Sequence, residues 1–298
     1  MENIVEFKNV NKCFGRNKVI QNATFKIKKN SICGFIGPNG AGKTTAIRVL
    51  LGILKATEGS AQVFGKDVWK DAVEIHKNIA YVPGDINLWP NLTGGEVIDL
   101  FIKLRGSNNT NRREELIKRF DLDPSKKCRT YSKGNRQKIA LIAAFASDTD
   151  LYILDEPTSG LDPLMENIFQ ECVLEAKEEG KSILLSSHIL SEVEELCNKV
   201  SIIREGQIIE SGTLEQLRHL TRTSIVVQTK KTVQGLEEVK GVHNIEKKND
   251  SIYFQVDTEK LDNAIKHISQ FELVKLESAP PTLEDLFMRH YRGEEGES

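Results

Sequence analysis

The chain has no long apolar run, and this absence excludes a membrane-spanning protein. No window approaches the roughly 20 apolar residues that a transmembrane helix needs, and short segments such as residues 182–185 are better explained as buried strands. Residues 1–10 include Glu2, Glu6 and Lys8, so they lack the apolar centre of a secretory signal. We therefore expect the chain to work at a membrane only through a partner.

The chain also lacks an excess of charge of one sign and lacks paired cysteines. Its 41 Lys and Arg residues against 43 Asp and Glu residues give a formal net charge of -2, which argues against nucleic acid as the main partner. Its cysteines are scattered and never form a C-x-x-C pair, which argues against a disulfide framework or a zinc site. They are Cys13, Cys33, Cys128, Cys172 and Cys197. A reducing cytoplasm fits this usage.

The hydrophobic pattern indicates one large and one small domain in 298 residues. Apolar alternation over the first 30 or so residues predicts antiparallel strands, and the segment 92–147 has a helical pattern that predicts a helical subdomain. From Leu151 onward, short apolar strands alternate with helices, which is typical of a largely parallel sheet. These strands are expected at 151–154 and 182–185, and the helices at 168–176 and 190–196. We place this α/β domain at residues 1–218.

The pattern changes past Leu220 and predicts a small α+β domain at residues 222–298. A helix from about Leu261 and a strand near Leu273 would follow three earlier strands in a β-α-β-β-α-β unit. The three earlier strands are expected at 224–228, 242–246 and 252–256, with a turn at 248–250 between the last two. A capped helix at 282–291 would end the chain.

The sequence GPNGAGKT after a predicted strand fits the phosphate-loop pattern G-x-x-x-x-G-K-[ST]. In such a loop, glycines let backbone N–H groups turn toward phosphates, and the start of the next helix adds a positive dipole end. Lys43 would reach the β and γ phosphates, the Thr44 hydroxyl would bind Mg²⁺, and Thr45 is a second hydroxyl nearby. The expected nucleotide-binding loop consists of Gly37, Pro38, Asn39, Gly40, Ala41, Gly42, Lys43 and Thr44.

Two carboxylates follow the buried strand expected at 151–154, and they emerge at its carboxyl end. Asp155 would hold the Mg²⁺ shell, while Glu156 would orient or deprotonate the attacking water. Without the phosphate loop, an acidic pair that merely ends a strand would be the simpler interpretation.

Between these two elements lies YSKGNRQ at residues 131–137, followed by an apolar helix. Here the sequence resembles the ABC ATPase family, whose signature LSGGQ precedes a helix at this point. In that family the signature binds the γ-phosphate held by the opposite cassette of a dimer. The resemblance carries this role to Ser132 and Gly134, with Asn135 at the helix start, although Lys133 and Asn135 depart from the pattern. An ordinary N-cap at Ser132 is the structural alternative.

The resemblance extends over residues 1 to about 215 and assigns further roles. It implies that Asp162 belongs to the loop that communicates between the two sites and that His188 is the switch histidine that contacts the γ-phosphate. Phe14 is expected to stack on adenine, with a core phenylalanine as the alternative. The family normally has a glutamine where this chain has Gly84, and we hypothesise that Asp85 or an extra water replaces its amide.

The resemblance implies the fold of a P-loop NTPase ABC cassette and the activity of an Mg-ATP hydrolase that powers an ABC transporter. The variant segments at 82–85 and 131–135 look like the exporter branch related to drug and antibiotic resistance. We expect a second cassette, identical or different, an integral membrane subunit that selects the substrate, and a location at the inner face of the cell membrane. A soluble ABC ATPase acting on ribosomes or DNA is the alternative. That class usually carries two cassettes or a long coiled coil, whereas this chain has one phosphate loop and no extended heptad run.

Overall fold

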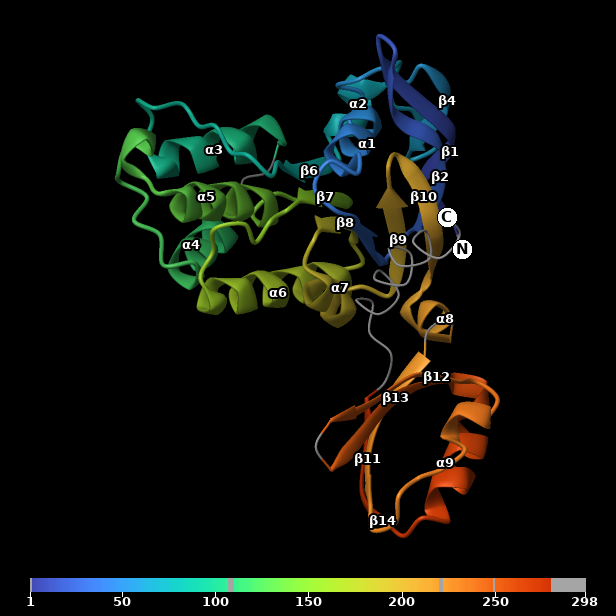
Figure 1. Cartoon of the computed structure of the whole chain (residues 1–298). Coiled ribbons are helices and arrows are strands. Elements are labelled where there is room, and N and C mark those ends of the chain that lie inside the picture. Colours follow the sequence, from blue (N-terminus) through green and yellow to red (C-terminus); the bar gives the residue numbers. More distant parts are fainter. Residues whose placement is uncertain (1, 107–109, 220–221, 249, 280–298) are drawn as a thin grey trace. The chain divides into compact units, whose positions relative to one another are not determined.

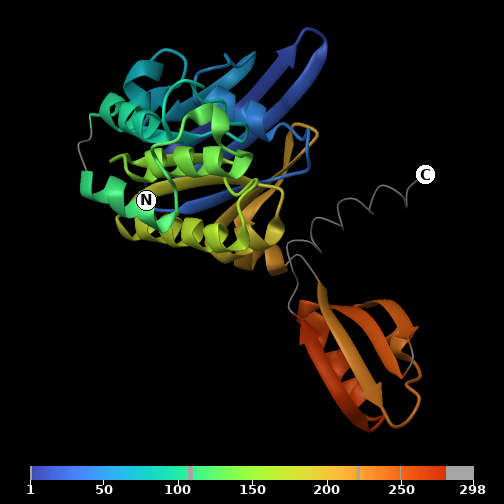
Figure 2. The ribbon, with the colours of Figure 1, turned by 90° about the vertical axis from the view of Figure 1, so that its left-hand side faces the viewer.

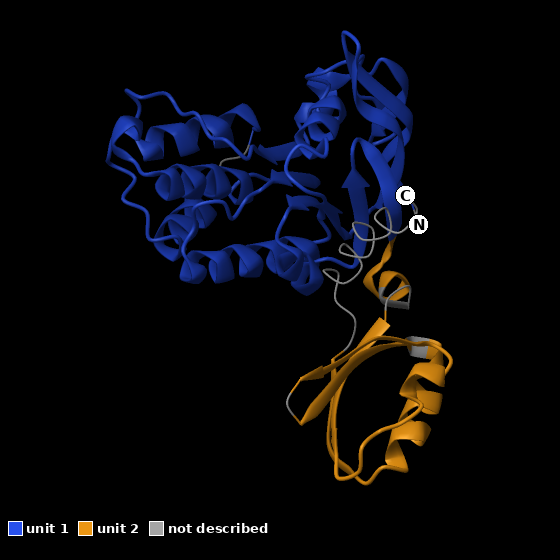
Figure 3. Cartoon of the chain, in the orientation of Figure 1, with its two compact units in different colours: residues 1–211 blue, residues 212–298 orange. Residues whose placement is uncertain are grey.

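The computed structural model forms two compact units, residues 1–211 and residues 212–298 (Figure 3). The structure describes residues 2–106, 110–219, 222–248 and 250–279. The helix expected at 282–291 lies outside these residues. No helix within the described ranges is both long enough and apolar enough to cross a bilayer.

A six-stranded sheet forms the centre of the first unit, in the order β10-β9-β3-β8-β7-β6. Every residue of β3, β7 and β8 is buried, as expected for parallel strands covered on both faces. Strands β9, β3, β8, β7 and β6 run parallel to their neighbours in this order, which confirms the expected parallel core. The strands are β3 Ile32–Ile36, β6 Ile79–Val82, β7 Leu151–Asp155, β8 Ser182–Ser187, β9 Lys199–Arg204 and β10 Gln207–Thr213.

The turn between β9 and β10 also holds the glycine-rich loop after β3. The turn consists of Glu205 and Gly206, which both have positive φ angles (48° and 80°), as two-residue hairpin turns require. The Gly206 N–H donates to the Ala41 carbonyl at 2.9 Å, and the Gly206 carbonyl accepts from the Gln21 N–H at 2.8 Å. A side chain at Gly206 would meet the Val19 carbonyl at 2.2 Å, so glycine is required here.

A separate four-stranded sheet, in the order β2-β1-β4-β5, packs beside the central one (Figure 1). Strand β1 pairs with β2 and β4 in antiparallel fashion, which confirms the expectation for the first 30 residues. Phe25 lies 4.9 Å from Phe7 and 5.1 Å from Phe35 between ring centroids, so aromatic packing joins this sheet to β3. The strands are β1 Asn3–Phe14, β2 Asn17–Lys28, β4 Glu58–Val63 and β5 Lys66–Asp67.

A helical subdomain projects to one side of the sheets, where Figures 1 and 2 show its helices stacked. A capping box starts its first helix, because the Thr93 side chain accepts from the Glu96 N–H and the Glu96 side chain accepts from the Thr93 N–H. Arg119 pairs with Glu171 and Glu175, which joins α4 to α6. The subdomain contains α3 Gly94–Leu104, α4 Thr110–Arg119 and α5 Lys133–Phe145. The other helices of this unit are α1 Lys43–Leu50, α2 Ala72–His76, α6 Pro163–Glu178 and α7 Leu190–Leu196.

The second unit has an antiparallel sheet in the order β12-β13-β11-β14, with α9 along one face (Figures 1 and 2). Ile225, Phe254 and Ile268 belong to the buried cluster between sheet and helix. The β-α-β-β-α-β order predicted a helix between the first two strands of this unit. This prediction is wrong, because only a 3-10 turn, Leu236–Glu238, occurs between Gly235 and Gly241. The elements are α8 Leu214–His219, β11 Arg222–Thr229, β12 Val242–Lys248, β13 Ser251–Asp257, α9 Leu261–Ser269 and β14 Leu273–Ala279.

Candidate functional site

The loop after β3 has the backbone shape that its glycines permit. Gly40 and Gly42 have φ angles of 82° and 105°, in the left-handed region that other residues avoid. A side chain at Gly37 would meet the Ile203 carbonyl at 2.3 Å. Helix α1 begins immediately after Gly42, so the unpaired N–H groups of its first turn face the end of the loop.

Lys43 points its ammonium back into this loop. Its Nζ donates to the Gly37 carbonyl at 2.6 Å and to the Pro38 carbonyl at 3.3 Å, and it lies 3.2 Å from Oε1 of Glu156. The side chain is only 6% exposed, and a buried ammonium is stable only with such partners. A cation held by neutral carbonyls and one carboxylate is suited to bind phosphate oxygens.

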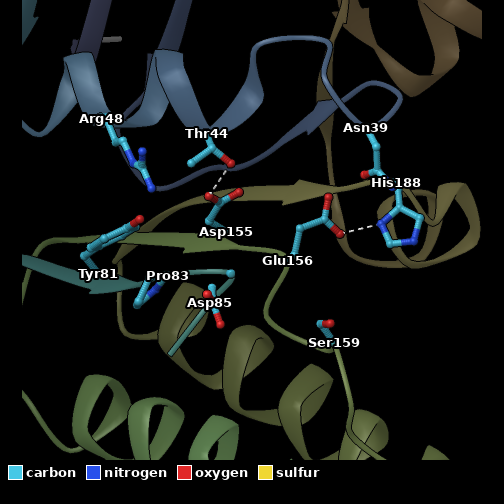
Figure 4. Close-up of a pocket in the computed structure, with 11 residues that line it drawn as sticks. Asn39, Thr44, Arg48, Tyr81, Pro83, Asp85, Asp155, Glu156, Ser159 and His188 are labelled. Atoms are coloured by element: carbon cyan, nitrogen blue, oxygen red, sulfur yellow. Dashed lines mark hydrogen bonds and ion pairs between the residues drawn. The ribbon is translucent and has the colours of Figure 1, made fainter. Parts of the chain in front are cut away.

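Thr44 and Asp155 bring two hard oxygen ligands together at the carboxyl ends of β3 and β7. The Thr44 Oγ1 donates to Oδ2 of Asp155 at 2.9 Å (Figure 4). The Ser186 hydroxyl donates to Oδ1 of the same carboxylate at 2.5 Å. The donor set fits Mg²⁺, which takes a few protein oxygens and completes its octahedron with water and substrate phosphates. Within the described residues no group of three or more His, Cys, Asp and Glu side chains could hold a metal.

Glu156 follows Asp155 with a φ angle of 49°, a conformation that few residues other than glycine adopt. Its N–H donates to the Ser186 carbonyl at 3.0 Å, which holds this backbone against β8. Its carboxylate lies between Lys43 and His188, whose Nδ1 is 2.5 Å from Oε2. Such backbone strain is often found where a side chain must be aimed at a reacting group.

Thr44, Asp155, Glu156 and His188 line one pocket of about 370 Å³, a volume in the range of small-molecule sites. In Figure 4, Arg48 and Tyr81 lie on one side of Asp155, and Asn39 and His188 on the other. Burial raises the pKa of Tyr81 to about 12, with a smaller contribution from the Asp155 charge. The pocket is lined by Asn39, Thr44, Arg48, Tyr81, Pro83, Gly84, Asp85, Asp155, Glu156, Ser159 and His188.

Sequence reasoning missed three of the residues around this pocket, namely Arg48, Tyr81 and Ser186, whereas Ser159 belongs to the predicted loop that ends at Asp162. Arg48 lies four positions after Thr44 on α1, so helical spacing could have placed both on one face. Ser186 pairs with Asp155 in parallel register, which only the strand order reveals. Glu192 is a further buried carboxyl near the pocket, and burial raises its pKa. Its Oε2 accepts a hydrogen bond at 2.9 Å from Ser187, the residue before His188.

Gly84 and Asp85 both line the pocket. The family resemblance leads us to expect a glutamine at position 84. A side chain at Gly84 would lie 3.2 Å from the Asp155 carbonyl and 3.5 Å from the Glu156 Cβ. In Figure 4 the Asp85 carboxylate points away from Thr44 and Asp155. In this arrangement the Asp85 carboxylate does not lie where the missing amide would contact the Mg²⁺ ligands.

We expect Gly84→Gln to lower the ATPase rate, although it restores the residue that the family normally has. The new Cβ would lie 3.2 Å from the Asp155 carbonyl, so the backbone that holds Asp155 and Glu156 would have to shift by a few tenths of an ångström. We expect a loss of about severalfold, smaller than the roughly hundredfold that a misplacement of about 1 Å can cost. Steady-state hydrolysis measures the effect, with Lys77→Gln, at an exposed position outside the pocket lining, as the control. A rate equal to or above that of the unmodified chain would contradict this account.

The signature residues lie at the start of α5, and in the described structure neither Ser132 nor Gly134 lines the pocket. Ser132 is the N-cap and accepts from the Asn135 N–H at 3.3 Å, so the capping alternative describes its role within one chain. Gly134 lies against Gly160, because an added Cβ would meet the Gly160 carbonyl at 2.4 Å. Asp162 caps α6 by accepting from the Met165 N–H at 3.0 Å.

The remaining candidates lie around the loop. Phe14 is 48% exposed at the end of β1. The alternative interpretation, a phenylalanine buried in the core, is therefore wrong. Lys12 lies above its ring, with Nζ 4.8 Å from the centroid. Thr45 is half-buried on the first turn of α1, and Ala41 is buried.

The comparisons with known proteins decide the family. The model of the ABC transporter family matches residues 20–159, and that of the DrrA1-3-like ATP-binding protein C-terminal domain matches residues 212–291. An uncharacterised ABC transporter ATP-binding protein of Bacillus subtilis, YhaQ, is 32% identical over 94% of this chain and 95% of its own length. The chain belongs to the ABC transporter ATP-binding proteins. The loop after β3 and the acidic pair after β7 both lie within the segment that the family model matches.

Further relatives of this ABC ATP-binding protein span nearly its whole length. The bacitracin transport ATP-binding protein BcrA of Bacillus licheniformis is 31% identical, over 97% of each chain. The linearmycin resistance protein LnrL of Bacillus subtilis is 30% identical, over 96% of this chain and 97% of its own. A solved ATP-binding subunit of an ABC transporter superposes with a TM-score of 0.70 at 31% identity, over 73% of this chain and 92% of its own.

Proposed function

We propose that this chain hydrolyses Mg-ATP to drive the export of drugs, antibiotics or other amphipathic compounds through a separate membrane subunit. The observation that carries the proposal is that Thr44, Asp155 and Glu156 line one pocket, with the Lys43 ammonium 3.2 Å from the Glu156 carboxylate. The full-length relatives named for bacitracin transport and linearmycin resistance support the export of such compounds. The match of the C-terminal unit to the DrrA-like domain points the same way.

Each pocket residue has a chemical task in this mechanism. Lys43 would exchange its carbonyl partners for phosphate oxygens, while Thr44 and Asp155 would hold Mg²⁺, which neutralises charge on the phosphates. Glu156 would then be free of the ammonium and could accept a proton from the attacking water. His188, 51% exposed, would keep the Glu156 carboxylate oriented from its other side and contact the γ-phosphate.

The site of one chain is incomplete, because Ser132 and Gly134 lie outside its pocket. We propose that a second cassette, identical or different, supplies them, with Asn135 and the start of α5, to the nucleotide of the first. Phe14 would stack on adenine, which agrees with its exposed ring. The fold-level neighbour MJ0796, a bacterial ABC transporter cassette solved as a dimer, supports this arrangement (TM-score 0.65, 23% identity).

We place the working protein in the cytoplasm, bound to the inner face of the cell membrane through its partner. The partner is proposed to dock near residues 84–96. Trp89 is 51% exposed there, and its ring lies 6.1 Å from that of Phe101. Loss of the γ-phosphate would separate the cassettes and move the docked helices of the membrane subunit.

Purification of the tagged chain from membranes tests the proposal. We expect a multi-spanning membrane protein to co-purify and to increase the ATPase rate of the chain. Cells that lack this partner should lose resistance to its substrate, and cells in which Glu156→Gln replaces the native chain should lose it equally. Co-purification with ribosomes or DNA, and no membrane protein, would instead support the soluble class of ABC ATPase.

A further inference from the structure

The segment that carries the signature residues is bound to the segment that follows Glu156 in the same chain. The Gln137 Nε2 donates to the buried Pro157 carbonyl at 2.7 Å. Gly134 leaves no room for a side chain against the Gly160 carbonyl. Two parts of the chain that serve different nucleotides in the proposed dimer are therefore packed together within one subunit.

Lys133, where the family signature has glycine, adds a third and polar contact. Its Nζ donates to the Ser159 Oγ at 2.7 Å, and its side-chain carbons lie 3.4 Å from the position of a Cβ at Gly160. Ser159 is a pocket residue, and its own N–H donates to the Glu156 carbonyl at 3.2 Å. The contacts therefore form a continuous path from the signature through Lys133 and Ser159 to the backbone of Glu156.

Helix stability does not explain a lysine at this position. Lys133 is the first residue of α5, where the positive end of the helix dipole repels a cation, and the first turn has no acidic residue. Among the described residues no carboxylate lies within ion-pair distance of Lys133. The hydroxyl of Ser159 is therefore the contact that fixes its ammonium.

We propose that Lys133 is a positioning residue that couples the two ATP sites of the dimer by holding the signature segment in register with Ser159. When Glu156 and Ser159 shift with the state of their own nucleotide, Lys133 carries that shift to Ser132, which faces the nucleotide of the opposite chain. The inference rests on the proposed function, because it requires a dimer with shared sites.

Mixed dimers with one active site test the coupling. One chain carries Glu156→Gln, so the only active site combines the Glu156 of the normal chain with the signature of the other. Lys133→Met, which keeps the carbons over Gly160 and removes the donor, is then placed on either chain. We expect it to lower turnover about fivefold on either chain, the size of effect expected from one lost hydrogen bond. ATP affinity of the separate chains should change less than about twofold, since Lys133 lies outside the pocket.

Three further variants complete the test. Ser159→Ala should reproduce the loss and add nothing to Lys133→Met, whereas Lys133→Arg should recover most of the activity. Lys138→Met, on the same helix, serves as the matched control and should leave turnover unchanged. A second measurement, the ATP-induced dimer of Glu156→Gln chains followed by light scattering, needs no hydrolysis and should weaken with Lys133→Met.

The outcomes separate the possible explanations. A loss only when Lys133→Met is on the chain that carries Glu156→Gln would mean direct contact with the opposite nucleotide, and would overturn the coupling. Unchanged turnover in both placements would also overturn it. Absence of hydrolysis and of dimers before any change at Lys133 would instead contradict the assembly of the site from two copies of this chain.

Discussion

Glu156→Gln is expected to bind ATP with nearly normal affinity and to hydrolyse it at least about a hundredfold more slowly. A positioned general base contributes roughly 10²-fold to 10⁴-fold, and glutamine has nearly the same shape but accepts no proton at neutral pH. The substitution keeps an acceptor near Lys43 and His188, so the pocket should retain its form. The trapped nucleotide should hold two chains together, which size-exclusion chromatography with Mg-ATP would detect as a dimer.

Glu178→Gln is the matched control for this experiment, since Glu178 is exposed at the end of α6, away from the pocket lining. It should leave both turnover and oligomeric state unchanged. Normal turnover in Glu156→Gln would show that another group accepts the proton. A slow enzyme that never dimerises would instead contradict the assembly of the site from two chains.

Lys43→Ala is expected to abolish ATP binding as well as hydrolysis. The ammonium is the buried cation of the loop, and its removal leaves Glu156 facing the phosphates without an intervening positive charge. A charge-assisted phosphate contact of this kind contributes on the order of a hundredfold in affinity, and the uncompensated Glu156 charge weakens binding further, so nucleotide near its normal dissociation constant no longer binds. Nucleotide then no longer stabilises the fold, because stabilisation by a ligand falls with its affinity.

Thermal unfolding with and without Mg-ATP measures this loss. The unmodified chain should melt at a higher temperature with nucleotide, whereas Lys43→Ala should melt at the same temperature in both conditions. Lys118→Ala, an exposed lysine on α4, should behave like the unmodified chain. An undiminished nucleotide-induced shift in Lys43→Ala would remove Lys43 from the binding site.

The sequence predicted the parts of the site that depend on local spacing. The loop glycines, Lys43 and Thr44 lie within one motif, and Asp155 and Glu156 follow a strand whose apolar run is unmistakable. The largely parallel sheet and the helices around it could be predicted for the same reason. The α9 helix and the strands beside it were also predicted, since their apolar alternation is regular.

Contacts between distant segments could not be predicted, because spacing within a motif does not report them. The hydrogen bond from Ser186 to Asp155 depends on the order of the strands in the sheet. The hydrogen bond from Lys133 to Ser159 depends on how α5 packs against the loop after β7. The close approach of Gly84 to Asp155 likewise explains a missing glutamine only once both loops are seen together. The helix predicted after β11 does not form, because the segment is short and contains Gly235 and Gly241. It makes only the single 3-10 turn Leu236–Glu238.

The Glu205–Gly206 turn has a consequence for how nucleotide is captured. The backbone of Gly206 hydrogen-bonds to Ala41 in the phosphate loop and to Gln21 on β2. These bonds connect the loop to both sheets of the first unit. The loop is therefore already ordered before ATP binds, and binding costs less conformational entropy than it would with a flexible loop. The loop is in this sense preorganised for phosphate by hydrogen bonds within the protein.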